Sequence, residues 1–133
     1  MNKRSLLPLL AALLAAPAAF AQQIDCDNAI VQADITACAA EDFKSADGDL
    51  NETYAQAVAA MKEIDSYQPE GDRGAEEALR VAQRAWLPYR DATCAAEGWM
   101  MHGGSMEQTV VYGCLADVTR ARTEALRTLF EQN

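Results

Sequence analysis

Apolar residues recur at every third or fourth position along three stretches of the chain, the spacing that gathers side chains on one face of an α-helix. The first stretch runs from about Gln32 to Ile64, the second from about Gly74 to Ala96, and the third from Ser105 to about Phe130. No stretch shows the β-branched alternation of a strand. The pattern predicts an all-α fold, a small antiparallel bundle of three main helices.

Helix-breaking residues separate these stretches. The sequence SYQPEGDRG at 66–74 predicts the first turn, and Gly98 to Gly104 predicts the second. Ser105, with Gln108 three residues later, has the pattern of a capping box that begins the third helix.

The apolar stripes define a candidate core. Trp86 and Tyr89 lie on the second stripe, so we expect both to be buried. Gly48 costs about 1 kcal/mol relative to alanine and allows a kink or break in the first helix. Pro88 predicts a kink in the second helix. The stripes are Ile35, Ala39, Phe43, Ala46, Leu50, Tyr54, Val58 and Met61; then Leu79, Ala82, Trp86, Tyr89 and Thr93; then Val111, Leu115, Val118, Arg122, Leu126 and Leu129.

Facing residues of an antiparallel helix hairpin have numbers of nearly constant sum. Centring the first turn near residue 69 places Asp47 level with Arg90 and Asp91. Two carboxylates at one level can make a hydrolase site, but a neighbouring arginine favours a charge network that sets helix register. The expected network consists of Asp47, Asn51, Arg90 and Asp91, with Arg120 or Arg122 from the third helix.

Four cysteines indicate two disulfides in an oxidising compartment. Cys94 and Cys114 fall level across the second turn, so we expect them to pair, and Cys26 and Cys38 then pair by elimination. The crossed pairings remain open, because Cys26 precedes the first helix and its reach is not fixed. The cysteine spacings fit no zinc pattern, and we expect no metal and no cofactor.

Residues 1–21 have the pattern of a signal peptide, with basic Lys3 and Arg4, an apolar run, and a small-residue cleavage site ending at Ala21. We therefore expect a periplasmic or secreted protein without a stable membrane anchor, whose single domain spans 22–133. Losing two of the 11 basic residues leaves 9 against 20 acidic ones, a net charge of −11. Nucleic acid and anionic membranes are poor partners for such a chain. The charge favours a basic partner, unless it serves solubility alone.

The sequence GWMMHGGSMEQ at 98–108 is the candidate binding loop. Trp99, Met100, Met101 and His102 are residue types common at binding surfaces, although they also fit a lid folded over the end of the bundle. His102 and Ser105 resemble a base and a nucleophile, but the sequence places no third residue to orient the imidazole. We therefore expect no catalysis here.

Motifs in a fixed order carry a family resemblance: CDNAIVQADITAC, ADGDLNETY, AQRAWLPYRDATC, GGSM and CLADVTRARTEAL. Over about residues 26–129 this set resembles the lysozyme inhibitor LprI-like family, also catalogued as DUF1311. The resemblance implies a small exported helical domain with paired cysteines that inhibits animal-type (c-type) lysozyme, a strongly basic enzyme. It assigns no inhibitory residues. The chain departs from the family in lacking the lipid-attachment site of its name-giving member, and in having Val31 where a helix-capping threonine is usual.

Two functional hypotheses follow. In the first, the protein binds and inhibits c-type lysozyme through the 98–108 loop. An acidic field would steer the approach of the basic enzyme; its expected residues are Glu41, Asp42, Asp49 and Glu52. In the alternative, the protein is a structural or interaction module of the cell envelope without lysozyme activity. An enzyme is the least supported reading.

Overall fold

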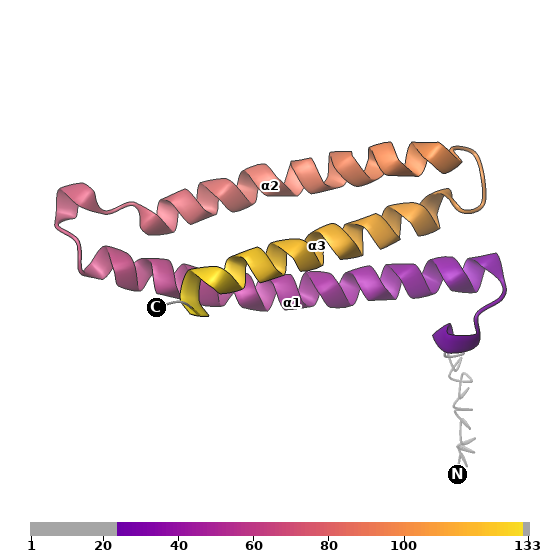
Figure 1. The fold of residues 1–133 in the computed structure, drawn as a ribbon, viewed down its shortest axis with the longest axis horizontal. Coiled ribbons are helices and arrows are strands. Elements are labelled where there is room, and N and C mark those ends of the chain that lie inside the picture. Colours follow the sequence, from indigo (N-terminus) through magenta and orange to yellow (C-terminus); the bar gives the residue numbers. More distant parts are fainter. Residues whose placement is uncertain (1–23, 132–133) are drawn as a thin grey trace, which may run out of the picture.

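The structure, a computed structural model, describes residues 24–131; the expected signal peptide at 1–21 and its cleavage site lie outside them. The described part holds three α-helices and three short 3₁₀ turns: η1 (Cys26–Asn28), α1 (Gln32–Ser66), η2 (Glu70–Asp72), α2 (Ala75–Gly98), η3 (Trp99–Met101) and α3 (Glu107–Glu131). In Figure 1, α2 runs back along α1, and α3 returns in the direction of α1. The predicted all-α, three-helix bundle is confirmed.

The helices are long and uninterrupted. α1 remains helical through Gly48, and α2 remains helical through Pro88. α3 begins at Glu107, and the first carbonyl of its ladder is that of Met106, which accepts from the N–H of Val110 at 3.0 Å. The predicted start at a Ser105 cap is therefore wrong by one residue.

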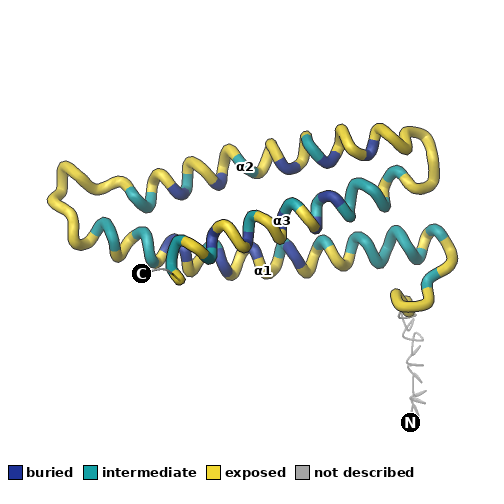
Figure 2. The backbone as a smooth tube through the Cα atoms, in the orientation of Figure 1, coloured by how far each residue is buried: buried dark blue, intermediate teal, exposed yellow. Residues whose placement is uncertain are grey.

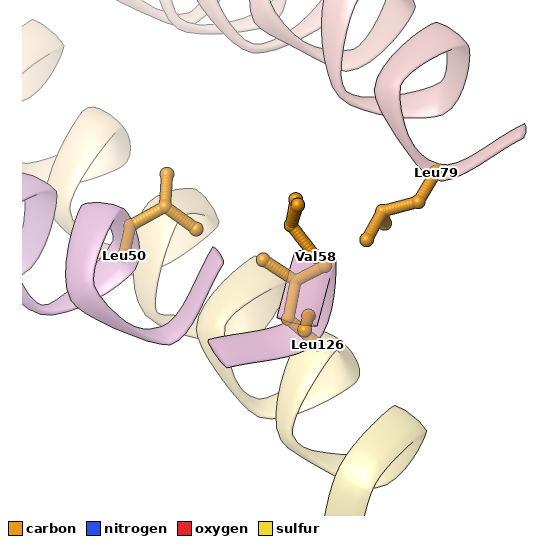
Figure 3. Packing of buried hydrophobic residues seen from close by; sticks show 5 residues of the cluster. Leu50, Val58, Leu79 and Leu126 are labelled. Carbon is orange, nitrogen blue, oxygen red and sulfur yellow. The ribbon is translucent and has the colours of Figure 1, made fainter. Parts of the chain in front are cut away.

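The apolar core occupies one part of the bundle, which we call the core end (residues 44–90 and 120–131). Figure 3 shows Leu50 and Val58 of α1, Leu79 of α2 and Leu126 of α3 converging there. α1 packs mainly against α3, and α2 covers the pair more loosely. Burying these side chains removes apolar surface from water, and each Å² removed contributes about 25 cal/mol to the stability of the fold. This contribution is the main favourable term in folding.

The inward face of α2 differs from the predicted stripe. Tyr89 is 63% exposed, so its expected burial is wrong, whereas its neighbour Arg90 is buried. The interior positions of α2 include Leu79, Gln83, Arg90 and Cys94. Hydrophobicity alone predicts the wrong inward face of α2, because two of these residues, Gln83 and Arg90, are polar. Each is buried together with a hydrogen-bonding partner from another side chain.

The opposite part of the bundle, the disulfide end (residues 24–43 and 91–119), is held differently. Disulfides join Cys26 to Cys38 and Cys94 to Cys114, which confirms the expected pairing. The fully buried side chains here are small or polar, such as those of Ala116 and Thr119. In Figure 2 the α2–α3 turn is exposed along its length. Covalent bonds thus provide the bracing that a core provides at the core end.

Candidate functional site

The candidate loop presents large apolar side chains to solvent. Trp99 is 65% exposed, Met100 80% and Met101 47%, and His102 is also exposed. These residues form η3 and the turn that follows it. Because these side chains are exposed, they do not form the lid over the end of the bundle that was the alternative expectation. Contiguous exposed apolar groups are typical of interaction sites.

The base of this loop is fixed by covalent and steric contacts. The Cys94–Cys114 bridge, with its Cα atoms 5.4 Å apart, ties the last turns of α2 to the first turns of α3. Gly98 is buried so close to α3 that a Cβ there would lie 2.5 Å from a methyl group of Val111. A larger residue at this position requires the Val111 side chain or the helix that holds it to shift.

Glu107 braces the tip of the loop. Its carboxylate accepts the backbone N–H of Gly103 at 2.8 Å and lies 3.3 Å from Nδ1 of His102. These interactions, the Gly103 bond first, hold the pKa of the Glu107 carboxyl below its usual value. Gly103 has a φ of +75°, a left-handed conformation that glycine adopts without strain.

The same brace positions the tryptophan. The imidazole of His102 stacks on the indole of Trp99, with ring centroids 3.8 Å apart and an interplanar angle of 24°. An exposed indole held by a stacked neighbour loses less rotamer freedom on binding than a free one. The loop is therefore a preorganised apolar projection.

Arg90 organises the expected charge network. Its guanidinium contacts Asp47 Oδ1 at 3.1 Å and Asp91 Oδ1 at 2.9 Å. It also lies 5.2 Å from the ring centroids of both Phe43 and Trp86. These partners compensate the cost of burying a positive charge, so α1 and α2 are held in register at this level.

The remaining members of the expected network are arranged around that centre. Asn51 donates to Asp47 Oδ2 at 3.2 Å. Arg122 contacts neither aspartate of the network. It donates to Gln83 Oε1 at 3.0 Å, and its guanidinium lies 5.9 Å from the ring centroid of Trp86. Burial lowers the pKa of Arg122 below its usual value.

One expectation about catalytic groups changes. The imidazole of His102 does have an orienting residue, Glu107, so the expectation that none exists is wrong. Among the hydrogen bonds of residues 24–131, however, none joins His102 to Ser105. The paired carboxylates Asp47 and Asp91 both contact the guanidinium of Arg90, which lies between them, and this arrangement suits a structural role.

The expected steering field is partly neutralised by ion pairs. Glu41 pairs with Lys44 at 3.2 Å, and Asp42 pairs with Arg120 of α3. Asp49 and Glu52 are exposed on α1. Charge that is already paired contributes little to the long-range potential felt by an approaching molecule.

Sequence reasoning missed the brace by Glu107 and the buried Gln83. An acidic residue in the first turn of a helix that follows glycines is a signal for the first, since its carboxylate can accept the exposed N–H groups there. Spacing offers a signal for the second, because Gln83 lies four residues after Leu79 and three before Trp86, both of which face the core.

No group of three or more possible metal ligands occurs within residues 24–131. In the same part of the chain, no helix is long and apolar enough to cross a membrane.

Comparisons with known proteins agree with this architecture. The chain is 46% identical to an uncharacterized protein of Rhizobium meliloti (strain 1021) over 134 residues, which cover 96% of each chain. It superposes on the crystal structure of a DUF1311 family protein from Pseudomonas putida KT2440 with a TM-score of 0.64 and 27% identity, covering 74% of this chain and 93% of that one. Residues 26–126 match the family described as lysozyme inhibitor LprI. The protein therefore belongs to the lysozyme inhibitor LprI family.

Proposed function

We propose that the protein is an exported, most simply periplasmic, inhibitor of c-type lysozyme that acts by binding and not by chemistry. Membership of a family described as lysozyme inhibitor LprI supports this activity, and two disulfides fit an extracytoplasmic location. The observation that carries the proposal is the exposed, braced stack of Trp99 on His102.

The proposed mechanism is steric. The loop from Trp99 to His102 enters the sugar-binding cleft of the enzyme and blocks access of the cell-wall chain. Aromatic and methionine side chains suit this role, because they supply large contact areas in a desolvated centre. The rigid base formed by the Cys94–Cys114 bridge lets the loop bind without paying for its own ordering.

The experiment measures lysozyme-driven lysis of a cell-wall suspension against a titration of the purified, oxidised protein at low and moderate salt. We expect saturable inhibition near equimolar ratio, weakened by salt because opposite charges steer the encounter. No inhibition at large excess would contradict the proposal and favour the envelope interaction module.

A loop variant locates the contact. Replacing Trp99 and Met101 with alanine should weaken inhibition by roughly 100-fold, the effect expected of two central contacts. A matched control replaces Tyr67 and Val81, which are 77% and 50% exposed at the core end, and should inhibit like the wild type. Unchanged inhibition by the loop variant, with unchanged helicity, would exclude this loop from the interface.

A further inference from the structure

Charge is distributed very unevenly between the two ends of the bundle. The disulfide end contains nine aspartates and glutamates and no lysine or arginine, whereas the core end contains eleven acidic and nine basic residues. The disulfide end therefore has a formal charge of −9 and the core end one of −2. Lys3 and Arg4 complete the whole-chain value of −9.

Ion pairs neutralise the acidic residues nearest the core end but not those at the tip. Glu41, Asp42, Asp91 and Asp117 each pair with a lysine or arginine of the core end. Among the described ion pairs, none joins a lysine or arginine to the acidic residues farther out. Those residues are Asp25, Asp27, Asp34 and Glu97; Glu107 lies 3.3 Å from His102 instead.

The exposed apolar residues gather at the same end. Seven of the eleven large exposed hydrophobic side chains belong to the disulfide end, and they come from two segments. One is the loop already described, with Met106 beyond it. The other precedes α1: Ile30 is 91% exposed, Val31 56% and Ile24 41%. We call residues 24–31 the N-terminal arm.

Two connections place the arm and the loop at the same end of the bundle. The Cys26–Cys38 bridge, with Cα atoms 5.6 Å apart, folds the arm back against α1. The hydroxyl oxygen of Thr109 in α3 accepts a hydrogen bond from Gln32 Nε2 at 2.9 Å. The same hydroxyl lies 2.8 Å from the hydroxyl of Thr36. Since Val31 precedes Gln32, and Met106 lies one helical turn before Thr109, the arm and the loop lie at the same end of the bundle. Figure 1 shows them on its two sides, with the starts of α1 and α3 between them.

From this arrangement we infer that the partner docks end-on, on a composite surface formed by the N-terminal arm and the α2–α3 loop, and that the unpaired acidic residues of the tip orient it. The inference rests on the proposed function and adds a second contact segment and an orientation to it. The occupant is a strongly basic protein whose apolar cleft is rimmed by lysine and arginine.

Charge complementarity selects this occupant over two others. A second copy of the chain would bring two ends of charge −9 together, and an anionic membrane would repel the same end. A basic protein is attracted to it and is turned so that its positive rim surrounds the apolar centre. The acidic face of α1 that includes Asp49 and Glu52 belongs to the nearly neutral core end and contributes less.

The experiment compares two triple variants that have the same change in net charge. Surface plasmon resonance measures the rate at which each variant associates with c-type lysozyme at several salt concentrations. The tip variant is Asp27→Asn, Asp34→Asn and Glu97→Gln. The matched control is Asp49→Asn, Glu52→Gln and Glu70→Gln. We expect the tip variant to associate roughly tenfold more slowly at low salt and to lose much of the salt dependence, and the control to stay within about twofold of the wild type.

A second pair of variants tests the apolar arm. Ile30→Ser with Val31→Ser should dissociate roughly tenfold faster, because these side chains lie inside the interface. Tyr67→Ser is the control; Tyr67 lines a groove of about 510 Å³ with Ile64 and Phe130 at the core end. Circular dichroism checks that all variants remain helical.

The outcomes separate the two proposals. If the wild type binds and the two charge variants are equally impaired, only total charge matters and the end-on orientation is overturned. If the wild type binds but the arm variant is unchanged, or the Tyr67 variant alone loses binding, the arm is not part of the surface. If the wild type does not bind lysozyme at all, the proposed function fails and the inference falls with it.

Discussion

The two ends of the bundle solve the problem of stability in different ways. The core end buries leucines from all three helices and balances eleven acidic residues with nine basic ones. The disulfide end buries mainly small or polar side chains, exposes seven large apolar ones, and is tied by two disulfides. Because covalent bonds do not require burial of apolar surface, they leave apolar residues free for a partner.

This division predicts that stability and recognition can be disturbed separately. Substitutions at the core end should lower the free energy of unfolding while the folded fraction still binds. Substitutions at the disulfide end should affect both, because the same contacts hold the chain and position the loop.

The largest loss of stability is expected for Leu126→Ala. Leu126 is fully buried against α1, so its truncation leaves a cavity and should cost about 4 kcal/mol in urea unfolding. Inhibition per folded molecule should equal that of the wild type. Leu87→Ala, at a site 39% exposed, is the control and should cost under about 1 kcal/mol. Equal losses from the two changes would contradict the assignment of the core.

The next effect is expected for Cys94→Ala with Cys114→Ala. Opening the 20-residue loop should lower the free energy of unfolding by about 3 kcal/mol. It should also weaken lysozyme inhibition, because the base of the loop is no longer fixed. Inhibition that stays at wild-type strength in the folded double variant would show that the bridge does not position the loop.

Acid should destabilise the core end through Asp65. Its carboxylate accepts the N–H groups of Gly74, Ala75 and Glu76 at 2.8–3.0 Å, and these bonds, the Gly74 bond first, lower its pKa. A carboxyl whose pKa is lower in the folded state stabilises the fold above its unfolded pKa, and this contribution disappears as the pH falls through the folded value.

The measurement for Asp65 is the melting temperature from about pH 7 to about pH 2. The Asp65→Asn variant keeps one accepting oxygen but loses the negative charge and the acceptor for Glu76, so it should melt about 5 °C lower near neutral pH, and the gap should narrow in acid. A gap that is constant with pH would show that the charge of Asp65 is not involved. Glu63→Gln, two residues away, provides a control for the loss of one negative charge.

The smallest effect is a gain, expected for Val31→Thr. Val31 is the N-cap residue of α1 and offers no side-chain hydrogen bond, so a threonine should add about 0.5–1 kcal/mol of stability. The same change removes an exposed methyl group from the N-terminal arm and should weaken lysozyme binding slightly. Stability and binding that increase together would contradict the view that this end gives up stability for recognition.

Much of the fold follows from the sequence, and the exceptions have physical causes. The three helices and both disulfides are predictable, because apolar periodicity and the level of Cys94 and Cys114 are local or arithmetic properties. The burial of Arg90 in place of Tyr89 is not, since it depends on partners from α1 that no single helix reveals. Ser105 fails as the predicted cap because α3 begins one residue later, at Glu107.

The sequence singles out the candidate loop but not the second segment of the proposed surface. Composition alone identifies Trp99 to His102 as unusual. The proposed contribution of Ile30 and Val31 depends on the Cys26–Cys38 bridge, which closes a separation of 12 residues, and on the hydrogen bonds of Thr109 to Gln32 and Thr36, which join residues 77 and 73 apart in sequence. The charged residues can be counted in the sequence, but the difference in charge between the two ends becomes apparent only when the helices are placed side by side in the fold.

Amide hydrogen–deuterium exchange of the protein, with and without c-type lysozyme, tests the central claim most directly. The account predicts the slowest exchange of the free protein around Leu50, Val58 and Leu126 at the core end. It predicts that lysozyme protects amides of the N-terminal arm and of the loop at 98–108. Protection confined to the groove beside Tyr67, or along the middle of α1, would contradict it.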